Sequence, residues 1–110
     1  MGDKGEMNVY RIESEQGVGP YWSAKKHDSL EAMRNRHNSD KDRWPGPYDE
    51  GCSGHMRGKL CGFFGIAQLL AWFSLDEIRM MRSLGFRIVR VTNPHNLTIL
   101  TKQCIFERQA

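Results

Sequence analysis

The feature of this sequence that most constrains its fold is residues 61–74, the one long run in which hydrophobic side chains dominate. Two glycines interrupt the start of the run, which predicts a short strand or bend leading into a buried helix. Spacing of i, i+3, i+4 and i+7 predicts that one buried helical face is made of Ile66, Leu69, Leu70 and Phe73. The hydrophobic core is therefore expected to begin here.

A second helix is expected directly after this run. Ser74 and Glu77 have the spacing of a capping box, in which each side chain accepts a hydrogen bond from the other residue's backbone, so the helix should begin at Leu75. Gly85 stands where a left-handed C-terminal cap is favoured. Together these signals predict a helix of about ten residues, in keeping with the usual length of helices in small domains.

Strands are expected on both sides of the helical part. Residues 86–92 have apolar side chains at both odd and even positions, which predicts a strand covered on both faces. Residues 97–101 and 103–108 supply more strand, either as two strands or as one strand with a bulge at Lys102. Residues 7–13 alternate as a half-buried strand does, and we expect this strand to pair with the C-terminal ones because it would be marginal alone.

Between the first strand and the hydrophobic run, the chain is polar. A short helix is expected to start at Asp28 or Ser29, either of which can cap it, and residues 38–60 read as a long loop. The sequence thus predicts a single α+β domain over residues 7–110, with a mostly antiparallel sheet and two or three helices. Residues 1–6 are expected to be a flexible tail.

Composition narrows the classes of function. The 110 residues include 16 basic and 13 acidic side chains, interleaved along the chain, which makes nucleic-acid binding an unfavoured prediction. A basic surface patch that binds nucleic acid would have to be formed by Arg79, Arg82, Arg87 and Arg90. Three cysteines without a CxxC pair favour a reducing cytoplasm over a disulfide framework, and no apolar leader precedes the first strand.

Cysteine and histidine chemistry has candidates but no convincing pattern. Cys52, His55 and Cys61 offer zinc ligands, with His27 or His37 as a fourth, but their spacing departs from compact zinc knuckles. A nucleophilic Cys61 is disfavoured because it belongs to an apolar run, where core packing is the ordinary role. We expect neither a metal nor a catalytic cysteine.

The aromatic loop at residues 43–48 is a stronger indication of binding. Its Trp-Pro-Gly-Pro-Tyr sequence places two large rings on a stiffened backbone, which suits a partner-binding surface or, equally, a lid packed on its own domain. The residues predicted to bind a partner are Trp44, Tyr48, Asp49, Phe63, Phe64, Arg79 and Arg82.

Several short motifs together resemble a group of small, mostly uncharacterised bacteriophage proteins. They are Val-Tyr-Arg-Ile-Glu at 9–13, Trp-Pro-Gly-Pro-Tyr-Asp-Glu-Gly at 44–51, Cys-Gly-Phe at 61–63 and Lys-Gln-Cys-Ile-Phe-Glu-Arg at 102–108. The motifs span nearly the whole chain. This resemblance implies a small phage accessory protein but no particular reaction.

A more distant resemblance is to the ADP-ribosyltransferase fold. The matching positions are Tyr10 and Arg11 in the first strand, Phe63, Phe64 and Gly65 before the central helix, and Gln103 near the last strand. Gly65 stands where one branch of that family commonly has a serine. Gln103 stands where that family has its catalytic glutamate, and an amide cannot act as a carboxylate. The resemblance therefore implies a nucleotide-binding or repurposed scaffold more than an active transferase.

Two hypotheses follow for function. The first is a phage-type accessory protein that binds a host protein or protein complex in the cytoplasm and inhibits a bacterial defence system, in the manner of an anti-CRISPR protein. It needs no cofactor, and binding is favoured over enzymatic activity. The alternative is an NAD-binding or ADP-ribosyltransferase-like protein with a cleft lined by Tyr10, Arg11, Phe63 and Gln103. If that protein is an enzyme, the candidate catalytic residues are Tyr10, Arg11 and Gln103. A virion component is a third possibility, neither favoured nor opposed by the sequence.

Overall fold

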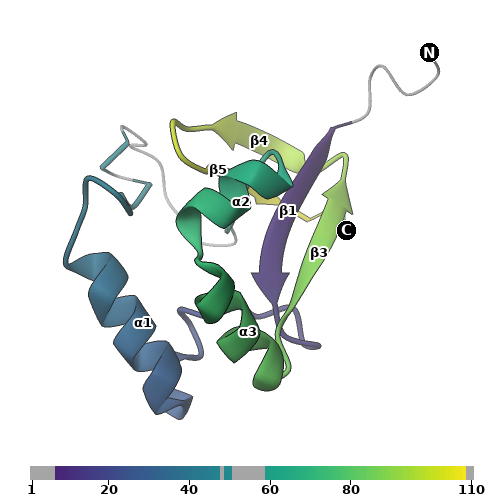
Figure 1. Cartoon of the computed structure of the whole chain (residues 1–110). Helices are drawn as coiled ribbons and strands as arrows, with labels where there is room; N and C mark the ends of the chain where they lie inside the picture. Colours follow the sequence, from purple (N-terminus) through teal and green to yellow (C-terminus); the bar gives the residue numbers. More distant parts are fainter. Residues whose placement is uncertain (1–6, 48, 51–58, 109–110) are drawn as a thin grey trace.

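The computed structural model describes residues 7–47, 49–50 and 59–108, and the residues between and beyond these ranges are left out of the description. The elements, in chain order, are β1 (Asn8–Glu13), a 3-10 turn (Ala24–Lys26), α1 (Asp28–Asn38), β2 (Leu60–Gly62), α2 (Ile66–Trp72), α3 (Leu75–Ser83), β3 (Arg87–Thr92), β4 (His95–Ile99) and β5 (Cys104–Glu107) (Figure 1). They form a single α+β domain with antiparallel strands, which confirms the predicted fold class.

The strands form two small sheets joined by one bridge. β1 pairs with β3, while β5 lies between β2 and β4. The bridge joins β1 to the end of β2: the Tyr10 N–H donates to the Phe63 carbonyl at 2.7 Å, and the Phe63 N–H donates back at 2.8 Å. The N-terminal strand therefore pairs with a C-terminal strand, as predicted, and the spatial order β3-β1-β2-β5-β4 leaves β3 and β4 at the two edges.

A small apolar cluster, here called the strand core, lies on one face of these strands. Its members come from all five strands and from the residue pair after β2: Val9, Leu60, Phe64, Val91, Leu97, Cys104 and Phe106. The strands must curl toward one another to bring these side chains together. At Gly62 an added Cβ would lie 2.4 Å from the Val9 Cγ1 atom, so a side chain there would collide with this cluster.

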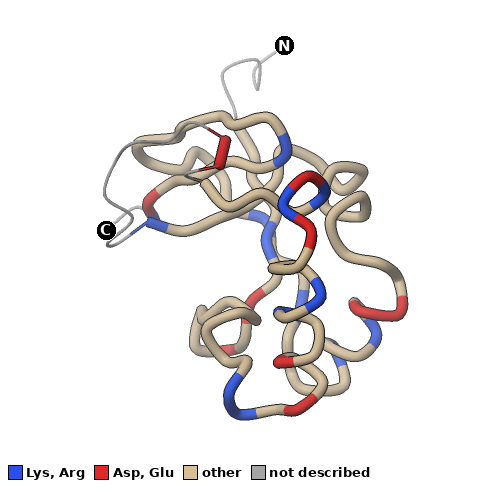
Figure 2. The backbone as a smooth tube through the Cα atoms, turned by 90° about the vertical axis from the view of Figure 1, so that its left-hand side faces the viewer, with Lys and Arg blue, Asp and Glu red and all other residues tan. Residues whose placement is uncertain are grey.

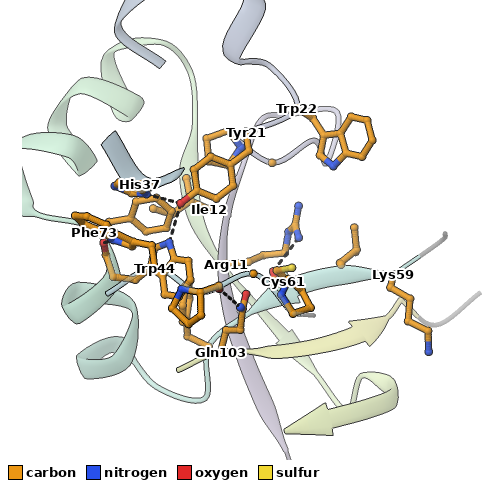
Figure 3. Close-up of a pocket in the computed structure, with 18 of the residues that line it drawn as sticks. Arg11, Ile12, Tyr21, Trp22, His37, Trp44, Lys59, Cys61, Phe73 and Gln103 are labelled. Atoms are coloured by element: carbon orange, nitrogen blue, oxygen red, sulfur yellow. Dashed lines mark hydrogen bonds between the residues drawn. The ribbon is translucent and has the colours of Figure 1, made fainter. Parts of the chain in front are cut away.

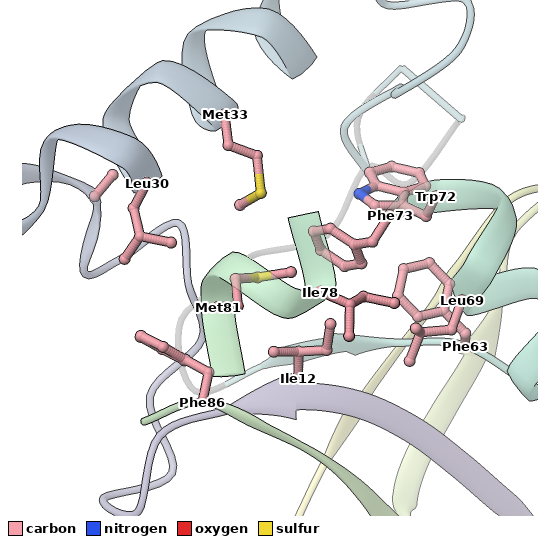
Figure 4. Packing of buried hydrophobic residues seen from close by; sticks show 11 residues of the cluster. Ile12, Leu30, Met33, Phe63, Leu69, Trp72, Phe73, Ile78, Met81 and Phe86 are labelled. Carbon is pink, nitrogen blue, oxygen red and sulfur yellow. The ribbon is translucent and has the colours of Figure 1, made fainter. Parts of the chain in front are cut away.

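A larger cluster, the helix core, lies on the other face of β1. Ile12 points into it from β1, and the helices cover it (Figure 4). Its buried members are Ile12, Ala24, Leu30, Met33, Phe63, Leu69, Trp72, Phe73, Ile78, Met81 and Phe86. β1 thus has an apolar layer on both sides, which explains why Val9 and Ile12 are both buried although they belong to opposite faces.

The buried face of α2 differs from the predicted one. Leu69 and Phe73 are buried as expected, but Ile66 and Leu70 are each 42% exposed, and Trp72 takes their place in the core. The helix ends at Trp72, and Phe73 already has an extended backbone with ψ of 130°. Because Phe73 is no longer helical, the i+7 relation to Ile66 does not hold, and the buried face is rotated.

The helix signals around α3 are confirmed. The Glu77 N–H donates to the Ser74 hydroxyl at 3.1 Å, and the Ser74 N–H donates to the Glu77 carboxylate at 2.9 Å, completing the capping box. Gly85 has a φ of +95°, the left-handed conformation expected at a helix C-terminus. At α1 the predicted start is confirmed, since the helix begins at Asp28, but the predicted cap is wrong: His27 is the N-cap residue and makes no side-chain cap, so neither Asp28 nor Ser29 caps this helix.

The prediction that β3 is covered on both faces is wrong. Most of its side chains are exposed, Ile88 to 37%, and within the described residues β3 pairs only with β1, at the edge of the sheet. Of the two alternatives for the C-terminal residues, two strands are confirmed and a bulge at Lys102 is excluded, since the Leu100 N–H donates to the Gln103 carbonyl at 2.9 Å and turns β4 back onto β5.

Candidate functional site: an aromatic cleft beside β1

A cleft of about 690 Å³ lies between β1, the turn that follows it, the C-terminal end of α1 and the segment around residue 44 (Figure 3). Aromatic and aliphatic side chains make up most of its wall, including Ile12, Pro20, Tyr21, Trp44, Phe63 and Phe73. The charged residues that line it are Arg11, Lys41 and Lys59, and among the described lining residues none is acidic. The cleft is therefore apolar with a cationic margin.

Trp44 packs onto its own domain and forms one wall of the cleft. Its indole Nε1 donates to the Trp72 carbonyl at 2.7 Å, and its ring stacks on the His37 imidazole with centroids 4.2 Å apart and planes 7° from parallel. The Arg43 guanidinium covers the indole at 4.5 Å. Of the two alternatives for this loop, the structure has Trp44 packed as part of the domain, with one edge left to the cleft.

Trp22 is the exposed aromatic residue that the sequence analysis missed. It lines the cleft, yet 88% of its surface is accessible, and Figure 3 shows its indole projecting outward at the rim. Its neighbour Tyr21 points the other way, into the domain. The turn before it, in which Gly17 has a φ of +80°, leads into the Tyr-Trp pair after Pro20, and no pattern in the sequence marks which of the two rings is exposed.

A chain of hydrogen bonds lies beneath the cleft and joins the helices. The Tyr21 hydroxyl lies 2.5 Å from the Nδ1 atom of His37, and the Trp72 Nε1 donates to that hydroxyl at 2.7 Å. The Nε2 atom of His37 lies 2.9 Å from the Glu77 carboxylate, which also accepts from Arg36 at 2.6 Å. This network was not predicted, because its partners on α1 and α3 lie far apart in the sequence.

The charge state of this network follows from its partners. Burial acts to raise the pKa of Glu77, but hydrogen bonds from His37, Arg36 and a backbone N–H outweigh it and bring the pKa to about 2. Glu77 is therefore a carboxylate, and the His37 Nε2–H donates to it. Burial raises the pKa of Tyr21, so its hydroxyl keeps its proton and donates to Nδ1. Every polar group in the network is paired, which fixes Tyr21 and the ring beneath Trp44.

Three of the positions matched to the ADP-ribosyltransferase pattern, those of Arg11, Phe63 and Gln103, face the same cleft. Arg11 and Gln103 both line it, whereas Tyr10 packs against the helix core. Their polar groups already have partners: the Arg11 Nε donates to Glu13 at 2.9 Å, and the Gln103 amide donates to the Pro45 carbonyl at 2.8 Å. Burial lowers the pKa of Arg11, and Glu13 opposes that shift.

Comparison with known proteins gives the family. A family model described as "Bacteriophage T4 Y00F protein" matches residues 7–110. The chain belongs to this family. No curated protein and no solved structure matches it. Membership in a bacteriophage family confirms the resemblance to small phage proteins, while the resemblance to the ADP-ribosyltransferase fold stays a prediction.

The remaining predicted binding residues of this phage-family chain are spread over the domain. Phe63 lines the cleft, whereas Phe64 packs partly against the strand core. Arg79 and Arg82 are exposed on α3 and do not line the cleft. Asp49 is exposed, and its carboxylate accepts from the Gly46 N–H at 2.8 Å, which holds the turn after Trp44. Tyr48 lies outside the described residues.

Charge and metal chemistry add no further site to the described part of this family member. Figure 2 shows acidic and basic residues interspersed along the backbone. Within the described ranges, no group of three or more His, Cys, Asp or Glu side chains could hold a metal ion, and the candidate ligands Cys52 and His55 lie outside those ranges. No helix in the described part of the chain is long and apolar enough to cross a membrane.

Proposed function

We propose that this phage protein is an accessory factor that binds a segment of a host protein in the aromatic cleft. The observation that carries the proposal is Trp22, a tryptophan left almost fully accessible at the rim of an apolar cleft. Tryptophan is enriched among the residues that dominate binding energy at protein interfaces. Folding of the domain by itself gives no reason to expose so large an apolar side chain beside a cavity.

The opposite wall of the cleft supports the same role. Trp44 is held by its hydrogen bond to the Trp72 carbonyl and by stacking on His37, which is itself fixed by Tyr21 and Glu77. A wall ordered before binding loses little conformational freedom when a ligand arrives. The cleft volume is also within the range of ordinary ligand sites, roughly 300–1,000 Å³.

The host target that we propose is a bacterial defence system such as CRISPR–Cas. The phage protein would inhibit it in the host cytoplasm by binding one of its proteins. Membership in a bacteriophage family and the small single domain support this choice. Binding is favoured over catalysis because the polar groups of Arg11 and Gln103 are engaged within the chain. Phe63 and Trp44 keep their proposed roles as cleft residues, while Tyr48 keeps its role as a prediction from the sequence.

The first test is affinity capture from host lysate with wild-type protein and Trp22→Ala. Leu75→Ala is the matched control, since Leu75 is also a well-exposed apolar residue but does not line the cleft. We expect wild type and Leu75→Ala to retain a host protein that Trp22→Ala loses. Recovery of the same proteins by all three would contradict cleft binding.

The defence role is tested separately from binding. Expression of the wild-type protein in a strain with an active CRISPR–Cas system should raise the plating efficiency of a targeted phage, and Trp22→Ala should not. A captured partner unrelated to defence, with unchanged plating efficiency, would leave the cleft as a binding site and exclude the anti-CRISPR-like role.

A second candidate is binding of NAD or a related nucleotide. It is favoured by the presence of Arg11, Phe63 and Gln103 in one cleft together with Lys41 and Lys59, since aromatic rings and cations suit a nucleotide base and its phosphates. Thermal unfolding with millimolar NAD tests it. A ligand at one hundred times its Kd stabilises the fold by about 2.7 kcal/mol, so an unchanged Tm with no transfer of labelled ADP-ribose would exclude this candidate.

A further inference from the structure

The outer edge of β3 is a second surface with the features of a binding site. β3 (Arg87–Thr92) pairs with β1 along its whole length, from Asn8 opposite Thr92 to Glu13 opposite Arg87, without a shift in register. Within the described residues no strand pairs with its other edge, and Figure 1 shows it at the margin of the domain. A regular open edge presents unpaired backbone groups to another chain.

The hydrogen bonds around β1 show which β3 residues present those groups. The Asn93 N–H donates to the Met7 carbonyl, whereas the N–H and C=O of Tyr10 both turn away from β3 to bond with Phe63. Alternate residues of an antiparallel strand bond to the same neighbour. Thus odd-numbered β3 residues bond to β1, and the residues that direct their N–H and C=O outward are Ile88, Arg90 and Thr92.

The other open edge, that of β4 (His95–Ile99), is blunted. Its pairing with β5 shifts register between His95 and Thr98, and Asn96 between them has a φ of +50°. A bulge of this kind twists an edge away from regular pairing. β3 has no such irregularity, so it is the edge suited to accept another strand.

The charge on β3 selects the kind of strand. Arg87 and Arg90 are exposed, and no ion pair joins either of them to an acidic side chain in the described part of the chain. Arg82, at the C-terminal end of α3, adds a third exposed cation close by in the sequence. A second copy of this chain would bring the same arginines to the contact, and like charges placed opposite one another in a sheet are destabilising.

We propose that the β3 edge binds an extended acidic segment of another protein by strand addition. The backbone of the segment would bond to Ile88, Arg90 and Thr92, and its carboxylates would pair with Arg87 on one face of the sheet and with Arg90 on the other. Main-chain bonds supply affinity in this mode of recognition, and side chains supply selectivity. The surface is separate from the cleft, since none of these β3 residues lines it.

The test uses a short peptide with consecutive glutamates between valines, so that carboxylates project from both faces of the added strand. It is titrated to millimolar concentration against isotope-labelled full-length protein and followed by backbone amide shifts. The expected result is a set of shifts centred on Ile88, Arg90 and Thr92, and much weaker shifts with the peptide in which lysine replaces glutamate. Absence of binding at millimolar peptide, equal binding of the two peptides, or shifts confined to the cleft would overturn the proposal.

Two variants separate the backbone and charge contributions. Ile88→Pro removes an outward N–H without removing a bond to β1, and proline is tolerated at such edge positions. Ile88→Pro should lower the affinity for the glutamate peptide by roughly tenfold. Ile88→Ala keeps the N–H, so its affinity for the peptide should stay within about threefold of the wild-type value. Equal affinity of the Ile88→Pro and Ile88→Ala variants would overturn strand addition.

The charge variant decides the question even if the proline variant fails to fold. Arg87→Glu combined with Arg90→Glu should reverse the preference, so that the lysine peptide binds and the glutamate peptide does not. An unchanged preference would overturn the proposal. Trp22→Ala is expected to bind the glutamate peptide as wild type does, so failure at the edge and failure at the cleft can be distinguished.

Discussion

The helix core and the strand core lie on opposite faces of β1, and they differ in how polar groups enter them. The helix core is bordered by the Tyr21–His37–Glu77 network, in which each polar atom has a partner. The strand core is apolar apart from the thiol of Cys104, whose pKa burial raises to about 12, so that it stays neutral. The stability of the helix core therefore depends on paired polar groups, and that of the strand core depends on close packing. Different substitutions should destabilise the two clusters.

The largest effect is expected from the strand core. Phe106 is fully buried on β5, so Phe106→Ala removes a ring that contacts the other strands and leaves a cavity. The free energy of unfolding should fall by about 3–5 kcal/mol, measured by urea denaturation. Phe106→Leu keeps most of the side-chain volume, so its loss in free energy of unfolding should be clearly smaller. A loss below about 1 kcal/mol for the alanine variant would mean that the strand core contributes little to stability.

The stability of the helix core should depend on acidic pH, whereas that of the strand core should not. The folded pKa of Glu77 lies near 2, below the ordinary value of 4.5, so this carboxylate stabilises the fold fully above 4.5 and loses that contribution as pH falls toward 2. The loss amounts to at most about 3 kcal/mol. Glu77→Gln should be less stable at neutral pH and should lack this part of the acid dependence. Parallel acid curves for wild type and variant would contradict the assignment.

A methyl group added to the strand core gives an intermediate effect. Gly62→Ala places a Cβ against the Val9 side chain and 3.1 Å from the Tyr10 carbonyl, so the bridge between β1 and β2 must shift. We expect a loss of about 1–3 kcal/mol in thermal or urea unfolding. Gly65→Ala is the matched control, because nothing lies within 4 Å of an added Cβ there. Equal stability of the two variants would show that the strand core can accommodate an extra methyl group at residue 62.

The smallest effect is expected on the outer face of α2. Ile66→Gln and Leu70→Gln replace exposed side chains and should each change stability by less than about 0.5 kcal/mol. Leu69→Ala, on the buried face of the same helix, should cost about 2–5 kcal/mol. The ranking would be reversed if the face predicted from spacing alone, with Ile66 in the core, were the buried one.

Sequence reasoning succeeded where the cause is local. The capping box of Ser74 and Glu77 and the left-handed Gly85 depend on residues within one turn, so the sequence alone locates α3. The α+β class follows from the same kind of signal, because strand and helix periodicities differ within a few residues. The first strand was also predicted, together with its pairing to the C-terminal strands, but the sequence did not tell that β3 is the partner.

Other features depend on what meets in space. The pairing of His37 with Glu77 spans 40 residues, and no periodicity marks it. Spacing did not tell which side of α2 is buried, since the answer depended on where the helix ends. The cleft itself was predicted only in part: Phe63, Arg11 and Gln103 line it, but Trp22 was missed because its exposure depends on the turn before it.

The long-range pairing of β1 has a consequence for synthesis of the chain. β1 bonds to β3, and the strand core needs Phe106, so β1 has neither its edge partner nor a covered strand-core face until these later segments have been made. Contacts so distant in sequence slow folding, because the intervening chain must be ordered first. During synthesis, α1, α2 and α3 are therefore made before the strands that complete the sheet.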